Sequence, residues 1–150
     1  MQQNPEIESI LEQAQKLASQ KNHEYITLEH LMLALVRHKR FWRCLEQFGV
    51  SPEAIDKDLV MYLDTQAVLV SAKGKVKEPR KTNALERVFN RALTQVMFGG
   101  RRSMSTIDIW LALMAESNSY ASYFMLKHGV QKQEFVIHWQ QTYEVKNNAA

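Results

Sequence analysis

Apolar residues recur at helical spacing along most of the chain, and no segment alternates between apolar and polar positions for long enough to predict a strand firmly. The clearest stripe lies near the N-terminus and consists of Ile7, Ile10, Leu11, Ala14, Leu17 and Ala18. Asn4 and Pro5 precede it, and this pair is typical of a helix start. The run Ala-Val-Leu-Val at 67–70 favours a β conformation, and we assign it to the start of a linker.

Start and stop signals predict three further helices in the first half of the chain. Thr27 is placed to cap a second helix, and a third spans about 39–48 and ends at Gly49. A glycine followed by an apolar residue is typical of the left-handed position that closes a helix. Ser51 opens a fourth helix, which continues to about residue 65.

The second half of the chain repeats this pattern at an offset of 78 residues. The offset places residues 7–14 on 85–92 and residues 25–35 on 103–113, and the second pair of segments ends in the same Leu-Ala-Leu. Two pairs in this half predict capping boxes at helix starts, namely Asn83 with Glu86 and Ser105 with Asp108.

Each copy is close to the lower size limit for an independent hydrophobic core, which is about 60 residues. We therefore predict an all-α fold in which two tandem four-helix repeats pack face to face with pseudo-twofold symmetry. The first repeat spans about 4–66, a linker about 67–82, and the second repeat about 83–145. Together they form a single domain over residues 1–150.

Composition favours a folded chain in a reducing compartment. The chain has 150 residues, of which 45% are hydrophobic, and a net charge of +3, which excludes a disordered polyelectrolyte. Its single cysteine, Cys44, cannot form an internal disulfide, and we expect it to serve in packing. The N-terminus lacks a signal-peptide pattern, and the apolar runs are too short to span a bilayer. We expect a cytoplasmic protein without a membrane partner.

Positive charge is concentrated in the linker. Residues 1–66 carry a balance of −3, residues 67–82 of +4 and residues 83–150 of +2. The five cations within 73–81 raise the alternative of a helical nucleic-acid-binding protein. The stretch has no interleaved aromatic residues, however, and the helix after Ser105 has no basic recognition face. We interpret the linker as a solvated segment and do not expect a nucleic-acid partner.

Motifs for catalysis are absent from the sequence. There is no phosphate-binding G-x-x-x-x-G-K-[ST] loop and no G-x-S-x-G elbow, so we expect binding without enzymatic activity. His23, Glu24, Glu29 and His30 cluster at the start of the second helix, and His23 could approach Asp64 if helix ends converge. The zinc patterns H-E-x-x-H and C-x-x-C are missing, so the spacing by itself predicts no cofactor.

Three segments resemble a known family. HEYITLEHL at 23–31, TNALERVFNRA at 82–92 and LKHGV at 126–130 are similar to motifs of the Clp N-terminal domain, which precedes the ATPase rings of the Hsp100/Clp unfoldases. The likeness is greatest to the ClpA branch and covers about residues 5–145. It implies a domain that docks adaptors and substrates for an ATP-dependent unfoldase, which in turn feeds a ClpP-type peptidase. The peptidase would be a partner only through the parent ATPase.

The resemblance also implies a site. In the ClpA branch the adaptor is ClpS, and the docking residues carried over by motif are Glu24, Glu29, Thr82 and Arg87. A zinc site associated with that branch would correspond to His23 and Asp64.

Two features depart from the pattern of the family. The second repeat has Ile107 where the ClpC branch carries the second acid of its phosphoarginine site. The linker is basic, whereas ClpA-type linkers tend to be acidic, so a different or more acidic adaptor would suit this chain better. A free-standing adaptor or decoy that uses the same fold is a further alternative.

Overall fold

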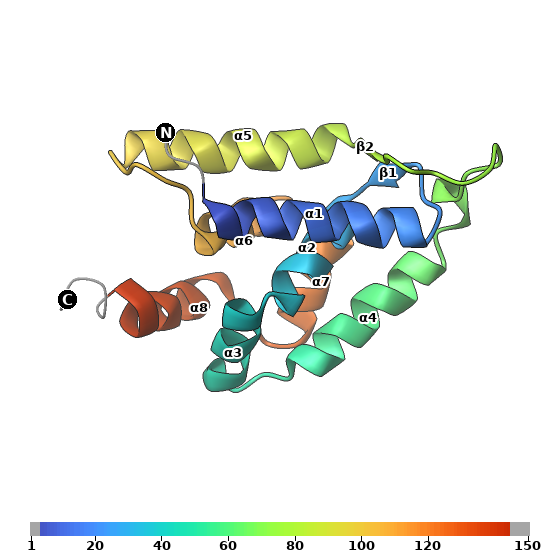
Figure 1. Ribbon diagram of the computed structural model, residues 1–150. Helices are drawn as coiled ribbons and strands as arrows, with labels where there is room; N and C mark the ends of the chain where they lie inside the picture. The colour runs from blue at the N-terminus through green and yellow to red at the C-terminus, as the bar shows by residue number, and fades with distance from the viewer. Residues whose placement is uncertain (1–3, 145–150) are drawn as a thin grey trace.

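The computed structural model describes residues 4–144, and this part of the chain has the predicted all-α fold (Figure 1). Within residues 4–144, four helices form the first half and four the second, and the two strands are very short. None of the helices in residues 4–144 combines the length and apolarity needed to cross a bilayer. The helices are α1 Pro5–Gln20, α2 Leu28–Arg37, α3 Lys39–Phe48, α4 Pro52–Asp64, α5 Asn83–Phe98, α6 Thr106–Met114, α7 Tyr120–Lys127 and α8 Lys132–Trp139, and a π-helical turn, Gln140–Glu144, extends α8.

The helix boundaries of the first half follow the predicted signals. The side chain of Asn4 accepts a hydrogen bond from Glu6 N–H at 2.9 Å, and Ser51 Oγ accepts one from Ala54 N–H at 3.2 Å. Thr27 caps α2, and Gly49 closes α3 at φ 100°, a left-handed conformation that a side chain would strain. Local sequence therefore determines where these helices begin and end.

One local prediction for the second half needs correction, and one is confirmed. Asn83 was expected to cap α5, but Thr82 does so, because its hydroxyl accepts a hydrogen bond from Leu85 N–H at 3.1 Å. At the start of the linker, residues 67–69 form a 3₁₀ turn in place of the β conformation that their composition favours. The pair Ser105 and Asp108 does cap α6, since the Asp108 carboxylate accepts from Ser105 N–H at 2.8 Å.

The core lies around α2, which packs against α1, α3, α4, α5, α6 and α7. Nine of its ten residues, 28–36, are buried. Its counterpart α6 carries Trp110, which is fully buried with its ring 4.8 Å from that of Phe135. Cys44 is also buried, and burial raises the pKa of its thiol to about 12, as expected for a packing residue. The two central helices thus join both repeats into one hydrophobic core.

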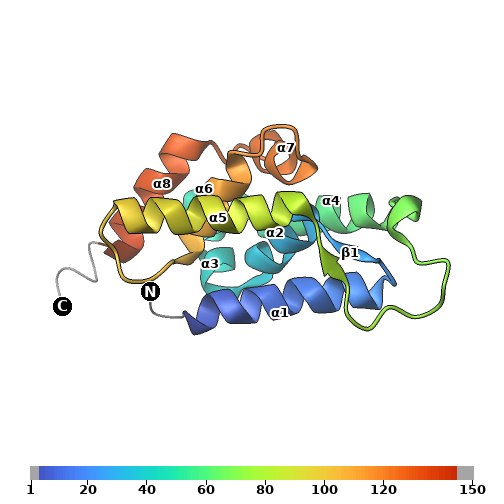
Figure 2. The ribbon, with the colours of Figure 1, turned by 90° about the horizontal axis from the view of Figure 1, so that it is seen from above.

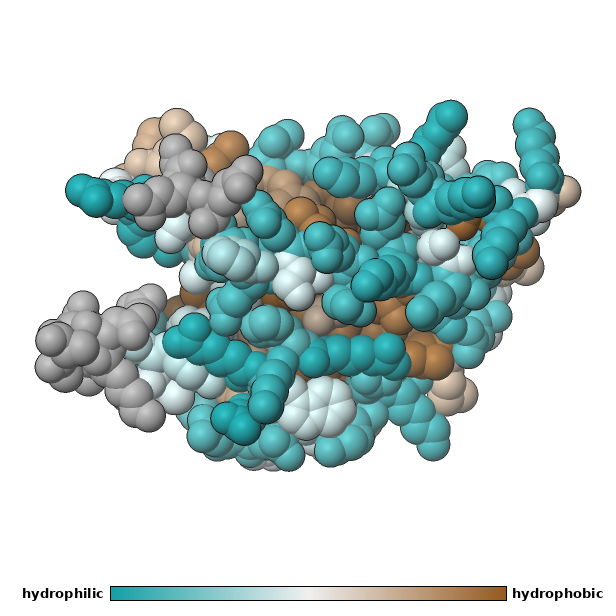
Figure 3. All heavy atoms as spheres, in the orientation of Figure 1, coloured by the Kyte–Doolittle hydropathy of each residue, from teal (hydrophilic) through white to brown (hydrophobic). Residues whose placement is uncertain are grey.

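The long helices α1 and α5 lie on the outside and run in opposite directions (Figures 1 and 2). Each has 16 residues, and the two are offset by 78 positions, as the internal repeat requires. Figure 3 shows that the face presented by α1 is mainly hydrophilic, with hydrophobic residues visible in the seams between helices. This is the surface of amphipathic helices whose apolar stripes face the core.

A pair of short strands, which the sequence pattern did not reveal, joins the two repeats. β1 (Tyr25–Ile26) and β2 (Arg80–Lys81) are parallel, and Arg80 N–H donates to Glu24 O at 2.8 Å. Pairing of only two residues leaves no period-two pattern to detect. The strands hold the segment that enters α2 beside the segment that enters α5.

The linker between the repeats is attached to the end of α1. Asn22 adopts a left-handed conformation at φ 57°, and its side-chain oxygen accepts a hydrogen bond from Val76 N–H at 2.8 Å. Ser19 Oγ donates to Val76 O at 2.8 Å. The basic side chains of this segment are exposed and form no ion pair within the described part of the chain; they are Lys73, Lys75, Lys77, Arg80 and Lys81.

Candidate docking site

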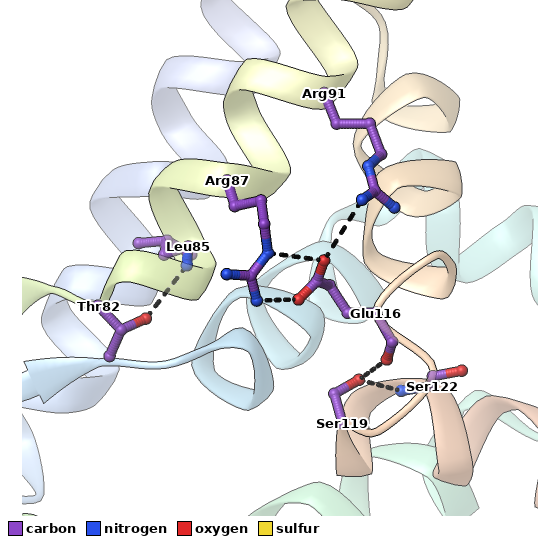
Figure 4. Close-up of polar contacts among 7 residues, drawn as sticks. All are labelled: Thr82, Leu85, Arg87, Arg91, Glu116, Ser119 and Ser122. Carbon is purple, nitrogen blue, oxygen red and sulfur yellow. Dashed lines mark hydrogen bonds and ion pairs between the residues drawn. The ribbon is translucent and has the colours of Figure 1, made fainter.

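Thr82 and Arg87 lie one turn apart at the start of α5 (Figure 4). Thr82 caps the helix, while the exposed Arg87 crosses to α6–α7 and forms a two-point ion pair with Glu116, with Nε 3.1 Å from Oε2. Arg91 approaches the same carboxylate at 3.8 Å. Hydrogen bonding from Arg87 lowers the pKa of Glu116, so the pair is ionised at neutral pH.

This ion pair borders a surface groove of about 400 Å³, which we call the junction groove. The groove lies where the first turn of α5, the loop after α6 and the first residue of α2 meet, so both repeats contribute to it. Apart from the ion pair, its lining consists of short or apolar side chains: Leu28, Ala84, Ala115, Ser117, Asn118 and Ser119. A shallow groove with one ion pair at its edge can orient a partner while leaving room for its side chains.

The loop that forms one wall of the junction groove is held at both ends. Ser119 Oγ donates to Glu116 O at 2.7 Å and accepts from Ser122 N–H at 3.1 Å, which caps α7. From α2, the Glu29 carboxylate reaches the same helix start and accepts from Ala121 N–H at 3.0 Å. The first repeat therefore fixes the position of a helix in the second.

Glu29 lies beneath the surface rather than on it. Its exposed fraction is 7%, and burial raises the pKa of its carboxyl, while the hydrogen bond from Ala121 N–H acts in the opposite direction. Glu24, by contrast, is exposed and directly precedes β1. Of the four residues predicted to bind an adaptor, Glu24 and Arg87 are exposed, Thr82 is half-buried and Glu29 faces the interior.

His23 and Asp64 do not form the zinc site that we had considered. His23 is buried, and its Nδ1 lies 2.9 Å from His30 Nε2, whereas the half-exposed Asp64 forms an ion pair with Lys21. Among residues 4–144, no group of three or more His, Cys, Asp or Glu side chains is placed to hold a metal ion. The donor set therefore does not fit zinc, which requires at least three protein ligands.

The two histidines form a neutral hydrogen-bonded chain instead. Thr27 N–H donates to His30 Nδ1 at 2.9 Å, so the proton of His30 is on Nε2, from which it is donated to His23 Nδ1. Burial, followed by the repulsion that His23 would exert if both rings were protonated, lowers the pKa of His30 to about 3, and burial also lowers the pKa of His23. This chain closes the start of α2 without placing a charge in the core.

Sequence reasoning missed Glu116 and Ser119 as parts of the site. Arg87 and Glu116 are 29 positions apart, and no motif around Glu116 marks it as a partner. Only the packing of α5 against α6 brings the two together.

The fold and the site define a class: an all-α module of two four-helix repeats, with a groove where the repeats meet. The sequence model of the Clp repeat (R) N-terminal domain matches residues 3–128. The chain therefore belongs to the Clp N-terminal domain family.

Relatives agree with this assignment. The chain is 31% identical over 138 residues to a ClpA homolog protein of Fuscovulum blasticum; the match covers 89% of this chain and 17% of that protein, so the chain spans a small part of this relative. The Hsp104 N-terminal domain from Candida albicans has a TM-score of 0.79 at 13% identity and covers 95% of this chain and 91% of its own. A complex of the ClpV N-domain with a VipB peptide has a TM-score of 0.67 at 17% identity, with coverage of 91% and 84%. These two structures support the fold.

Proposed function

We propose that this chain is the docking domain of a ClpA-like, ATP-dependent unfoldase, that it receives adaptor and substrate proteins at the junction groove, and that it has no catalytic activity of its own. The work of unfolding would belong to ATPase segments of the parent protein. A ClpP-type peptidase would meet the chain only through that parent, in the cytoplasm.

The observation that carries the proposal is the ion pair between Arg87 and Glu116 at the edge of a groove shared by both repeats. A partner that inserts a polar group there would replace the hydrogen bond between Arg87 and Glu116 with one of its own. Such an exchange fixes the position of the partner more than it increases the affinity. Membership of the family and the similarity to a ClpA homolog support the same role, as does the solved complex of a related N-domain with a partner peptide.

Three of the predicted adaptor residues serve this proposal directly, and the fourth supports them. Glu24, Thr82 and Arg87 are accessible around the β1–β2 pair and the start of α5. Glu29 acts indirectly. Its carboxylate accepts a hydrogen bond from Ala121 N–H and so holds the loop that lines the groove. The cationic linker enters β2 directly, so the partner we propose is a ClpS-like adaptor with an acidic surface.

Calorimetric titration of the chain with the ClpS-type adaptor of the same source tests the proposal. Arg87→Ala is expected to weaken binding about tenfold, since it removes a charged group from a specific contact. The matched control is Glu86→Ala, one residue away on the exposed surface of α5, which is expected to leave the affinity unchanged. No heat of binding at high micromolar concentration would refute adaptor docking, and equal affinities of the parent chain and Arg87→Ala would refute the junction groove.

A further inference from the structure

The first repeat has a second groove at the position equivalent to the junction groove. The 78-residue offset that relates α1 to α5 places Glu6 on Ala84, and the same offset places His38 on Glu116. Glu6 and His38 both line a surface groove, just as their counterparts Ala84 and Glu116 do. The internal repeat has therefore produced two related grooves, and their chemistry can be compared position by position.

This second groove, which we call the α1–α3 groove, has a volume of about 540 Å³. It is formed by the start of α1, the corner between α2 and α3, and the π-helical turn after α8. Its lining residues are Glu6, His38, Lys39, Arg40, Arg43, Gln47, Thr142 and Tyr143. A smaller groove of about 270 Å³ adjoins it through His38 and Lys39, and Ile10, Leu17 and Ala34 give that part an apolar floor.

The polarity of the ion pairs is reversed between the two grooves. In the junction groove the cations stand on the outer helix α5 and the acid, Glu116, on the corner. In the α1–α3 groove the acid, Glu6, stands on the outer helix α1, with His38 Nε2 at 3.3 Å and Arg40 Nη1 at 3.5 Å. A partner that suits one groove is therefore not complementary to the other.

The α1–α3 groove also carries an excess of positive charge. Lys39, Arg40 and Arg43 are exposed, and neither Lys39 nor Arg43 forms an ion pair within residues 4–144. The Arg40 guanidinium lies 4.6 Å from the centre of the Tyr143 ring, and the Tyr143 hydroxyl donates to Arg40 O at 3.2 Å. Stacking restricts Arg40, so less side-chain freedom is lost when it binds an anion.

We propose that the α1–α3 groove is a second docking site, and that it binds an acidic peptide segment of a partner protein. Glutamate or aspartate side chains of the partner would accept hydrogen bonds from Lys39, Arg40 and Arg43, and an apolar neighbour would cover the floor beside Leu17. The arrangement favours protein over nucleic acid, because Glu6 would repel a continuous phosphate backbone and the cations occupy a single short helix.

The test uses a fluorescein-labelled synthetic peptide in which glutamates alternate with leucines, with a control peptide that has glutamine in place of glutamate. Binding is followed by anisotropy, and its location by ¹⁵N–¹H spectra of the labelled chain. The acidic peptide is expected to bind and to shift the amides of residues 38–43 and 143, but not those of Arg87 and Glu116. The control peptide is expected not to bind.

Matched variants separate the groove from net charge. Arg40→Glu with Arg43→Glu is expected to raise the dissociation constant at least about tenfold, and to gain binding of a peptide with lysine in place of glutamate. Lys73→Glu with Lys75→Glu changes the net charge of the chain equally but is expected to leave binding of the acidic peptide within about twofold. If the reversed variant does not fold by circular dichroism, Arg40→Gln with Arg43→Gln replaces it.

Three results would overturn the proposal. The first is an equal loss of binding in the groove and linker variants, which would indicate non-specific attraction. The second is a set of amide shifts outside the α1–α3 groove. The third is tighter binding of oligothymidylate than of the acidic peptide at the same residues, which would identify the groove as a nucleic-acid site.

Discussion

The starts of α2 and α6 occupy equivalent positions in the two repeats, yet the two helices are capped by different chemical groups. At α2, Thr27 N–H donates to the neutral imidazole of His30, which continues to the buried His23. At α6, Ser105 N–H donates to the Asp108 carboxylate, which also forms a two-point ion pair with Arg101 at 2.7 and 3.0 Å. One cap is a pair of histidines without charge, and the other is an ion pair.

A second difference lies one position earlier in each helix. Glu29 of α2 crosses to the other repeat and caps α7, whereas its counterpart Ile107 of α6 is simply buried. Accordingly, α7 has a carboxylate at its N-terminus, while α3, the equivalent helix of the first repeat, has no side-chain cap and carries Lys39 and Arg40 in its first turn. The difference at this position accompanies the opposite polarity of the two grooves.

The largest effect that would test this comparison is the pH dependence of stability. Between pH 6.5 and the pKa of folded His30, about 3, the unfolded chain binds a proton that the folded chain excludes, so stability falls as the pH is lowered through this range. His30 alone contributes a slope of about 1.4 kcal/mol per pH unit. The lowered pKa of His23 acts in the same direction, and the raised pKa of Glu29 acts in the opposite direction above pH 4.5.

His30→Gln isolates this contribution. Glutamine suits the third position of a capping box and can both accept from Thr27 N–H and donate to His23, so the variant is expected to remain folded at pH 7.5. Urea unfolding at several pH values should show a slope reduced by about 1.4 kcal/mol per pH unit below pH 6. If the free energy of unfolding depends on pH equally in the variant and in the parent chain, the claim that a neutral His30 caps α2 is wrong.

A smaller loss is expected from Glu29→Ala. The change leaves the buried Ala121 N–H without its acceptor, and we expect a cost of about 2 kcal/mol in the free energy of unfolding, measured with urea. Glu24→Ala provides the control, because Glu24 is exposed and its substitution should change stability by less than about 0.5 kcal/mol. Equal stabilities of the two variants would mean that Glu29 is not the link between the repeats.

The elements that local sequence could predict are those whose cause is local. Helix starts at Asn4, Thr27 and Ser51 and the end at Gly49 depend on residues within one turn. The register of the internal repeat was visible because each helix buries an apolar stripe of the same period. The cap of α5 was misplaced by one residue, since Thr82 and Asn83 are both suitable N-cap residues and β2 determines which of them is used.

The site depends on contacts between distant residues, which is why sequence reasoning placed it only in part. Glu29 reaches Ala121 across 92 positions, so its inward direction could not follow from the motif around it. The pairing of His23 with His30 is closer in sequence, but the backbone of His23 also forms a bridge to Val70, 47 positions away, which no local motif indicates. The adaptor-binding roles of Glu24 and Thr82 are predictions that rest on the resemblance alone.

The most direct test of the central claim, that the junction groove docks an adaptor, is a ¹⁵N–¹H spectrum of the labelled chain titrated with its unlabelled ClpS-type adaptor. We predict amide shifts confined to residues 24–28, 80–91 and 115–119, with the α1–α3 groove unchanged. Shifts centred on residues 38–43, or an adaptor that saturates the chain without moving the amides of Arg87 and Glu116, would contradict it.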